Sequence, residues 1–379
     1  MKTVEIGGVG NVRKVLIGGE NPLVIQTMWK ERLSLDSRQE ETETLKRIEN
    51  LSDLGCGLLR FACPDIESAE TLGKLASLAS MPVSADIHFD YKIAMRCMDF
   101  PIAKIRINPG NIGNKDKVSQ VLQKAKDKSV PIRIGVNLGS LPADLRNSVN
   151  EGKITNAEAL VQAAVNELEI FSLYSFDNVL VSMKASGIED TIKSNILFAS
   201  KYPDTPLHIG VTEAGPLIAG VVRSSIALYS LLCLKIGNTI RVSLSDTMEK
   251  EIIAAREIIL AVNDYHLAHN AMQKDCTQKN QALSFNGGVR IVSCPRCGRC
   301  SFDTHKFTEK YQNYLYGLKK NITVAIMGCP VNGPGEAREA DIGITGAGGK
   351  VLIFKHGEII KRANPQDAET AFKEVIESL

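Results

Sequence analysis

Eight short apolar segments, each followed by a longer helical pattern, constrain the fold of this chain more than any other feature of its sequence. They lie between Leu23 and about residue 265 and read LVIQTM, GLLRFAC, PVSADI, KIRINPG, PIRIGVN, NVLVSMK, PLHIGVT and TIRVSL. The segments between them are amphipathic or charged, as in SRQEETETLKRIENLSDLG and DTMEKEIIAAREIILAVN. Strand and helix alternating eight times is typical of a (β/α)8 barrel of about 250 residues. We therefore predict an α/β fold, a (β/α)8 TIM-type barrel, for residues 1–265.

A second, smaller domain is predicted after the barrel. Residues 266–288, HLAHNAMQKDCTQKNQALSFNGG, lose periodicity and are interpreted as a linker. Residues 289–379 contain the strand-like segments VRIVSC, VAIMG, KVLIF and GEIIKR, a helical stretch near TEKYQNYLYGLKK and a closing helix in PQDAETAFKEVIESL. This order predicts a small α+β domain.

Charge and termini exclude several classes of protein. The 45 Lys and Arg residues nearly balance 43 Asp and Glu residues, and no run of like charge stands out, so we expect neither a nucleic-acid nor a membrane-surface partner. The start, MKTVEIGGVGNVRKVLIGG, lacks the apolar core of a secretory signal, and no later apolar run is long enough to span a bilayer. We expect a cytoplasmic protein, whose nine cysteines then form no disulfide framework.

Polar side chains follow the strand period in most of the apolar segments. In KIRINPG, Ile105 and Ile107 suit the helix-facing side, which places Arg106 and Asn108 on the barrel axis. The same alternation places these residues on the axis: Arg60, Asp86, His88, Arg133, Asn137, Ser182, Lys184, His208, Arg241 and Ser243. Glu213 directly follows PLHIGVT. The C-terminal ends of barrel strands are where such enzymes place their active sites.

Five inward cations from five different strands need an explanation, since like charges repel: Arg60, Arg106, Arg133, Lys184 and Arg241. A bound diphosphate would supply one, because each charge-assisted hydrogen bond contributes about 1.5–3 kcal/mol. Structural ion pairs with Asp86 or Glu213 are the alternative. We favour anion binding for the set as a whole. Glu213, a carboxylate in a cation-lined mouth, is the candidate general acid.

A cysteine cluster, SCPRCGRC, contains Cys294, Cys297 and Cys300. Further along, GCPVNGPGE contributes Cys329, flanked by turn-forming residues, and Glu336. Thiolate-rich sites suit an iron-sulfur cluster or zinc. The Cys-Pro pairs at Cys294 and Cys329 favour iron-sulfur slightly. The zinc alternative stays open at this point, and its ligands would be Cys294, Cys297, Cys329 and either Cys300 or His305.

Seven strings, in order along nearly the whole chain, resemble one family: ADIHFDYKIA, KIRINPGNIG, IRIGVNLGSL, PLHIGVTEAG, TIRVSLS, SCPRC and GCPVNGPGE. The family is the 4-hydroxy-3-methylbut-2-enyl diphosphate synthases of the methylerythritol phosphate route to isoprenoids, in the shorter, two-domain bacterial form. The resemblance implies an oxidoreductase with a barrel and a [4Fe-4S] domain. It implies reductive ring opening and dehydration of 2-C-methyl-D-erythritol 2,4-cyclodiphosphate to 4-hydroxy-3-methylbut-2-enyl diphosphate, with two electrons delivered through the cluster.

The resemblance also implies the site residues. Cluster ligands would be Cys294, Cys297, Cys329 and Glu336, which leaves Cys300 as a free thiol. Asp86 or Glu213 would handle protons. Matching motifs and strand alternation together predict the residues that contact the diphosphate substrate: Arg60, His88, Arg106, Asn108, Arg133, Asn137, Lys184, Arg241 and Ser243. Implied partners are a ferredoxin or flavodoxin electron donor and a second copy of the chain, in a homodimer whose active site is shared between subunits.

One loop departs from the family pattern, and two rival functions remain. QTMWKERLSLD places Trp29, Lys30, Glu31 and Arg32 where family members usually carry a Thr-rich run, so family contacts from this loop should not be transferred. A radical enzyme that cleaves S-adenosylmethionine is one rival, but its cysteines should follow the first barrel strand with a different spacing. A non-catalytic zinc module on a phosphate-binding barrel is the other.

Overall fold

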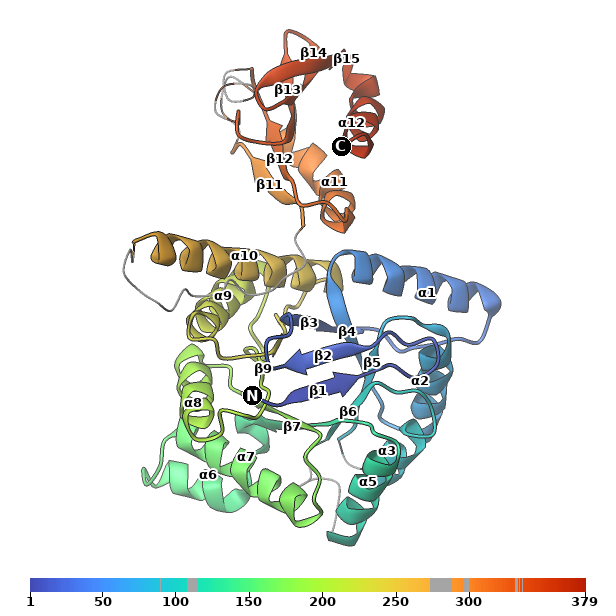
Figure 1. Cartoon of the computed structure of the whole chain (residues 1–379), viewed down its shortest axis with the longest axis vertical. Coiled ribbons are helices and arrows are strands. Elements are labelled where there is room, and N and C mark those ends of the chain that lie inside the picture. The colour runs from blue at the N-terminus through green and yellow to red at the C-terminus, as the bar shows by residue number, and fades with distance from the viewer. Residues whose placement is uncertain are drawn as a thin grey trace. The chain divides into compact units, whose positions relative to one another are not determined.

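The computed structural model describes residues 1–88, 90–107, 115–272, 288–295, 297, 300–330, 333, 335 and 337–379. The chain forms two compact units that divide between residues 285 and 286. Figure 1 labels the elements of both units along the chain. Among the described residues, no helix is both long and apolar enough to cross a bilayer.

Unit 1 is a parallel eight-stranded barrel, as the sequence predicts. Its strands are β3 (Val24–Met28), β4 (Cys56–Ala62), β5 (Val83–Asp86), β6 (Lys104–Ile107), β7 (Ile132–Asn137), β8 (Val179–Lys184), β9 (His208–Ile209) and β10 (Thr239–Ile240). Each strand from β3 to β7 pairs with the next along the chain, and β10 pairs with both β3 and β9. A parallel bridge between Val181 and Leu207 joins β8 to the residue before β9 and completes the ring.

Helices surround this barrel (Figure 1). They are α1 (Arg38–Asp53), α2 (Ile66–Leu78), α3 (Tyr91–Cys97), α5 (Lys115–Asp127), α6 (Ala143–Asn150), α7 (Asn156–Leu173), α8 (Ile188–Lys201), α9 (Leu217–Cys233) and α10 (Met248–Met272). Capping boxes start two of them, with Ser37 and Glu40 at α1 and Thr155 and Glu158 at α7. The helix α10 extends to Met272, into the segment predicted as a linker; residues 273–287 lie outside the described part.

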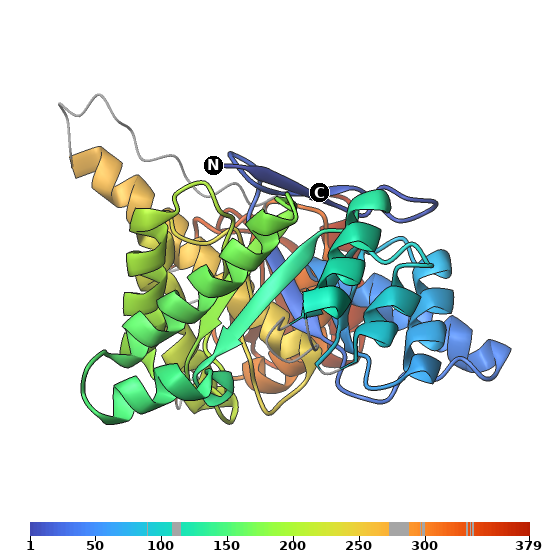
Figure 2. The same cartoon turned by 90° about the horizontal axis from the view of Figure 1, so that it is seen from below.

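An N-terminal hairpin that the sequence analysis did not predict covers one end of the barrel. Its strands β1 (Thr3–Ile6) and β2 (Val15–Gly18) pair antiparallel. Figure 2 shows the hairpin, in dark blue, at one end of the ring of helices. Its buried side chains pack on residues at or near the starts of barrel strands: Val4, Ile6 and Ile17 against Val24, Leu58, Ala103 and Leu180. The hairpin therefore closes the N-terminal end, and the opposite end is left for a ligand.

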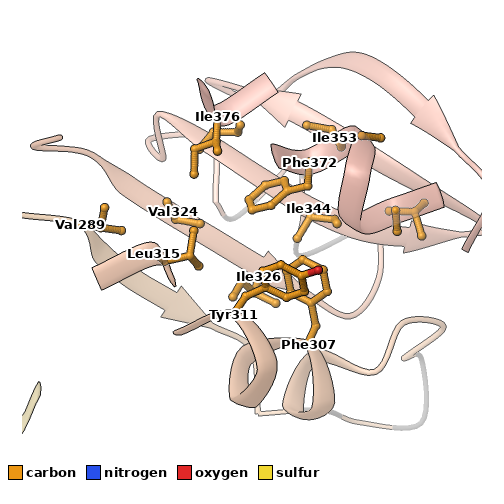
Figure 3. Packing of buried hydrophobic residues seen from close by; sticks show 14 residues of the cluster. Val289, Phe307, Tyr311, Leu315, Val324, Ile326, Ile344, Ile353, Phe372 and Ile376 are labelled. Atoms are coloured by element: carbon orange, nitrogen blue, oxygen red, sulfur yellow. The ribbon is translucent and has the colours of Figure 1, made fainter. Parts of the chain in front are cut away.

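Unit 2 is a mixed five-stranded sheet with helices. Its elements are β11 (Arg290–Ser293), α11 (Thr304–Gly317), β12 (Thr323–Met327), β13 (Ile342–Ala347), β14 (Lys350–Lys355), β15 (Glu358–Ala363) and α12 (Ala368–Glu377). Strands β11, β12 and β13 run parallel, while β14 is antiparallel to both neighbours. Figure 3 shows its core, where Phe307 and Tyr311 of α11 and Phe372 of α12 pack against Ile326 and Ile344 of the sheet. The predicted α+β domain is confirmed.

The central strand β13 is missing from the sequence prediction, which named no strand between VAIMG and KVLIF. Glycine normally weakens a strand, but two glycines here make room for neighbours. A Cβ on Gly343 would lie 2.1 Å from Phe354 Cζ, and a Cβ on Gly346 would lie 2.7 Å from Phe302 Cβ. The glycines that hid this strand from propensity rules are the residues that let it pack.

We expect Gly343→Ala to destabilise unit 2 by about 1–3 kcal/mol, because the new methyl group overpacks the core against the Phe354 ring. Guanidinium unfolding followed by far-ultraviolet circular dichroism measures the change. The matched control introduces Gly343→Ala into a Phe354→Leu variant. There the substitution should lower the free energy of unfolding by less, since the ring atom that the new methyl group would meet is absent. An unchanged unfolding midpoint in the single variant would contradict this account.

Candidate active site

The barrel interior is lined with buried cations, as strand alternation predicts. Arg106, Arg133 and Lys184 are each buried, and the Arg60 and Arg241 side chains are only 12% and 14% exposed. Burial first, then the nearby charges of Arg60 and Arg106, lower the pKa of Arg133. The structure thus brings all five predicted cations of the axis close enough to influence one another.

Asp86, at the end of β5, holds two of these arginines. Its Oδ2 lies 3.6 Å from Arg60 Nε and 3.5 Å from His88 Nε2, and its Oδ1 accepts from Arg106 Nη1 at 3.3 Å. Burial alone would raise the pKa of Asp86, but Arg60, His88 and Arg106 together hold it well below its usual range. Burial lowers the pKa of Arg60 to about 10, which leaves the guanidinium charged at neutral pH. Asp86 is therefore ionised and orients the arginines.

Lys184 and His208 form a buried pair on neighbouring strands β8 and β9. Lys184 Nζ lies 3.0 Å from His208 Nε2, and His208 Nδ1 lies 2.6 Å from Thr239 Oγ1. If Lys184 donates to Nε2, the ring proton lies on Nδ1 and is donated to Thr239. Burial, and next the surrounding cations, hold the pKa of both Lys184 and His208 well below their ordinary values. A neutral His208 thus supports the Lys184 amine.

Lys104, a buried cation inside the barrel, was missed by the sequence analysis. Lys104 is fully buried, and its Nζ donates to Gln26 Oε1 at 3.1 Å. Burial, and next Arg133, lower its pKa well below the usual range. Lys104 starts KIRINPG with the same strand alternation as Arg106, so the period-two pattern already contained the signal.

Two glycines create the space that the cations occupy. A Cβ on Gly135 would lie 2.3 Å from Arg106 Nε, and Arg106 Nη2 donates to the Gly135 carbonyl at 3.2 Å. A Cβ on Gly210 would lie 3.0 Å from Lys184 Nζ and 2.4 Å from the Arg241 carbonyl oxygen. A side chain at position 135 would displace the Arg106 guanidinium, and one at position 210 would displace the Arg241 carbonyl and crowd Lys184.

The remaining predicted residues lie at strand ends. Asn137 ends β7 and is half-buried, and half-buried Ser243 follows β10. Glu213 is exposed in the loop after β9, with a left-handed φ of 52°. His88 is exposed beside Asp86. Asn108 lies outside the described residues.

Structural ion pairs account for only part of the buried charge. Asp86 serves Arg60 and Arg106, and Glu251 Oε2, a buried carboxylate that sequence reasoning missed, lies 3.5 Å from Arg241 Nε. In the part of the chain that the structure describes, no ion pair links a carboxylate to Arg133, Lys184 or Lys104, and Arg133 Nε has no hydrogen-bond partner. Buried charges without partners cost free energy, so this arrangement is suited to a bound anion.

In unit 2, neighbouring parallel strands bring the cysteines together. Cys294 follows β11 and Cys329 follows β12, and the carboxyl ends of adjacent parallel strands meet at one sheet edge. The N–H of Gly328 donates to Cys294 Sγ at 3.2 Å. A Cβ on Gly328 would lie 3.2 Å from Cys294 Sγ and 2.5 Å from Cys300 Sγ, so only glycine fits between the two thiols.

Cys297 and Cys300 lie on the open side of this edge. Together with Ser301, Phe302 and Asp303 they line a hollow of about 550 Å³. Cys297 is exposed, whereas the Cys300 thiol donates to the Phe302 carbonyl at 2.8 Å. Glu336 lies outside the described residues.

The alternative zinc ligand His305 belongs to another contact. It lies in the first turn of α11 with its side chain 68% exposed, and its Nε2 is 3.6 Å from Glu309 Oε2. Among described residues, no three His, Cys, Asp or Glu side chains are grouped tightly enough to hold a metal ion. The described thiols thus lie around Gly328 and along the adjacent hollow.

Comparison with known proteins assigns the family. The GcpE TIM-barrel domain matches residues 8–256, and the GcpE protein C-terminal domain matches residues 290–378. The 4-hydroxy-3-methylbut-2-en-1-yl diphosphate synthase (flavodoxin) of Treponema denticola is 48% identical, with 95% of this chain and 92% of that protein covered. The proteins of the same name from Treponema pallidum and Clostridium tetani are 46% and 41% identical, with 100% and 96% of this chain covered and 92% and 96% of theirs.

Among solved structures, a Xanthomonas albilineans dihydropteroate synthase is similar to this chain at 10% identity and a TM-score of 0.45, over 71% of this chain and 99% of that one. The assignment rests on the sequence relatives and on the two domain matches. Because both domains match in order and the relatives align over nearly their full lengths, this chain belongs to the GcpE family, the 4-hydroxy-3-methylbut-2-en-1-yl diphosphate synthases.

Proposed function

We propose that the barrel binds 2-C-methyl-D-erythritol 2,4-cyclodiphosphate and that the chain converts it to 4-hydroxy-3-methylbut-2-enyl diphosphate in isoprenoid precursor synthesis. The observation that carries the substrate class is that Arg133 and Lys184 are buried inside the barrel and that neither forms an ion pair with a carboxylate among the described residues. A cyclic diphosphate offers several phosphate oxygens to a ring of converging cations. The residues that we propose to contact the cyclic diphosphate are those predicted from the sequence: Arg60, His88, Arg106, Asn108, Arg133, Asn137, Lys184, Arg241 and Ser243.

The reaction consumes two electrons and one proton and releases one water, so a proton donor is needed near the substrate. Asp86 and Glu213 were both predicted for this role. The ion pairs of Asp86 keep it deprotonated, which suits a group that positions Arg60 and Arg106. Glu213 is exposed and makes no ion pair with a described cation. We assign proton transfer to Glu213 and positioning to Asp86.

The ligand chemistry of the thiols of residues 289–379 suits a [4Fe-4S] cluster. Soft thiolate ligands select iron-sulfur clusters, and an N–H donated to a ligand sulfur, as from Gly328 to Cys294, stabilises its negative charge. We propose Cys294, Cys297, Cys329 and Glu336 as the ligands. When bound, the cluster would supply electrons one at a time to the substrate. Cys300 donates its thiol proton to a backbone carbonyl, which supports its assignment as a free thiol.

Partners follow from the relatives and from one surface. The relatives are named as flavodoxin enzymes, and we propose flavodoxin as the electron donor here as well, in the cytoplasm. The homodimer stays a proposal. It is supported by an apolar stripe on α9, where Ile218, Val222 and Ile226 are 80%, 53% and 48% exposed on one helix face. The predicted domain boundaries, with the barrel ending at residue 265 and the cluster domain beginning at residue 289, are also part of this proposal.

Electron paramagnetic resonance tests the proposed function. Protein is reconstituted with iron and sulfide without oxygen, reduced with dithionite, and measured before and after adding the cyclic diphosphate. We expect a reduced-cluster signal that changes when substrate is added, because the proposed reaction passes electrons from the cluster to the substrate. Zinc without sulfide in the purified protein, and no signal after reconstitution, would instead support the phosphate-binding barrel with a structural metal.

Cysteine substitutions test the ligand assignment. We expect Cys329→Ser to lose both the cluster and turnover, since a buried ligand thiolate is removed. Cys300→Ser should retain both, because the serine hydroxyl can still donate to the Phe302 carbonyl. Iron and sulfide analysis with the visible absorption spectrum is the measurement. Cluster loss in Cys300→Ser would overturn the assignment of Cys300 as a free thiol.

Proton uptake on ligand binding tests the anion site. Between its lowered pKa and its ordinary value of 10.5, the Lys184 amine is neutral in the free protein. A bound diphosphate favours the charged amine and raises this pKa, so binding should take up protons at mildly alkaline pH. Calorimetric titration in two buffers of different ionisation enthalpy gives the number of protons.

The matched control for this experiment is Lys184→Arg. Because its guanidinium stays charged, this variant should bind the cyclic diphosphate with a smaller uptake of protons. Lys104 also has a lowered pKa, so a residual uptake is expected in that variant. Binding heats that do not depend on the buffer in the unmodified protein would show that the diphosphate does not contact the buried amines.

A further inference from the structure

We propose that Lys30, in the atypical loop after β3, is a positioning residue that holds the loops carrying Ser243 and Glu213. The inference rests on the proposed function and deepens it. It concerns the loop QTMWKERLSLD, from which no family contact can be transferred.

Lys30 contacts the loop between β10 and α10, and β10 is the strand that pairs with β3 where the barrel closes. Its Nζ donates to the Leu244 carbonyl at 2.7 Å, to the Asp246 carbonyl and to Glu251 Oε1 at 2.9 Å. All three protons of the ammonium group thus have acceptors. The side chain is 27% exposed, so its charge is only partly screened by solvent. These contacts join the first and last strand-end loops of the barrel.

Glu251, at the start of α10, makes this junction rigid. It is 1% exposed and accepts from Thr27 Oγ1 at 2.6 Å and from the Leu244 N–H at 2.9 Å, besides Lys30. Its Oε2 also lies 3.5 Å from Arg241 Nε. The Glu251 carboxylate therefore holds residues on both sides of Ser243. Leu244 directly follows Ser243, and Arg241 precedes Ser243 by two residues. Glu251 has two cationic neighbours, Lys30 and Arg241. Without Lys30, it would keep only the longer contact with Arg241.

The same loop supports the loop of Glu213. The N–H of Ser245 donates to the Gly215 carbonyl at 3.1 Å. On the other side, Arg223 Nη1 donates to the Ala214 carbonyl at 3.0 Å. A Cβ on Gly220 of α9 would lie 2.5 Å from Leu244 Cδ2, so Leu244 is packed tightly as well. A shift of Leu244 and Ser245 would therefore move the backbone two residues from Glu213.

The contacts of Lys30 also have an electrostatic consequence. Carbonyl oxygens carry partial negative charge, and two of them in this loop point at Lys30. Oxygens engaged in this way cannot point at a diphosphate bound by Arg241 and Ser243. Lys30 thus aids anion binding by holding repulsive dipoles away from the anion, without contacting it.

The test compares two lysines that bind the same loop. Lys30→Met removes the junction, while Lys250→Met removes an equal charge from a half-buried pair with Asp246 Oδ2, which is 3.0 Å away and four residues earlier in the chain. Affinity for the cyclic diphosphate is measured by calorimetry on the reconstituted protein. Oxygen is excluded and no reductant is added. We expect Kd to rise about tenfold or more in Lys30→Met and less than about twofold in Lys250→Met. Equal effects of the two substitutions would overturn the proposal.

Further readouts separate positioning from folding. The single tryptophan, Trp29, is buried against Phe61 with ring centroids 5.4 Å apart, so its emission reports whether the neighbouring loop is intact. Lys30→Gln, which keeps a donor but not the charge, should bind with intermediate affinity, and kcat should fall in Lys30→Met because Glu213 is displaced. If every substitution at Lys30 abolished folding, Lys30 would be a structural residue and the proposal would be wrong.

Failure of the inference is distinguishable from failure of the proposed function. Unmodified protein that does not bind the cyclic diphosphate would overturn the proposed function itself. Unmodified protein that binds, together with a Lys30→Met variant that binds equally well and turns over normally, would overturn only the role of Lys30.

Discussion

Repulsion between buried cations is the constraint on which the barrel depends. Arginines and lysines from neighbouring strands converge on one axis, and only Asp86 and Glu251 pair with any of them inside the described barrel. Such an interior is costly to fold, and depressed pKa values of Lys184 and Lys104 show part of the response, since a neutral amine avoids the repulsion. An anion that binds the folded state would offset this cost and stabilise the protein by mass action. Stability and anion binding would then be coupled through the same charges.

The scaffold around these charges directs the anion to one end. The hairpin β1–β2 packs its apolar side chains over the N-terminal ends of the strands, so the interior is sealed there. Gly135 gives Arg106 its space, and Gly210 leaves room for Lys184 and for the Arg241 carbonyl, because a side chain at either position would crowd these groups. At the other end, Lys30 and Glu251 join the first and last loops. A rigid mouth of this kind holds cations in place before the ligand arrives, which is how preorganised sites gain affinity.

The second unit brings thiols close together while leaving space between them. Parallel pairing of β11 and β12 places Cys294 and Cys329 at one sheet edge, and Gly328 leaves room for the sulfur atoms. Its small core of aromatic and branched side chains (Figure 3) supports that edge. The sheet glycines follow the same logic as those of the barrel: each weak local preference corresponds to a close tertiary approach.

The eight strands, their inward cations and the cysteine positions could be predicted because each depends on a short-range period or spacing that a few consecutive residues carry. Lys104 belonged to the same pattern and was overlooked. The strand β13, the hairpin at the barrel base and the junction of Lys30 with Glu251 could not be predicted in this way. Gly343 weakens its strand locally and is explained only by Phe354 beside it. Lys30 meets Leu244 across 214 positions of sequence, and only the closed ring of strands brings them within hydrogen-bonding distance. Local periods determined which side chains face the axis, and closure of the barrel decided which of them meet.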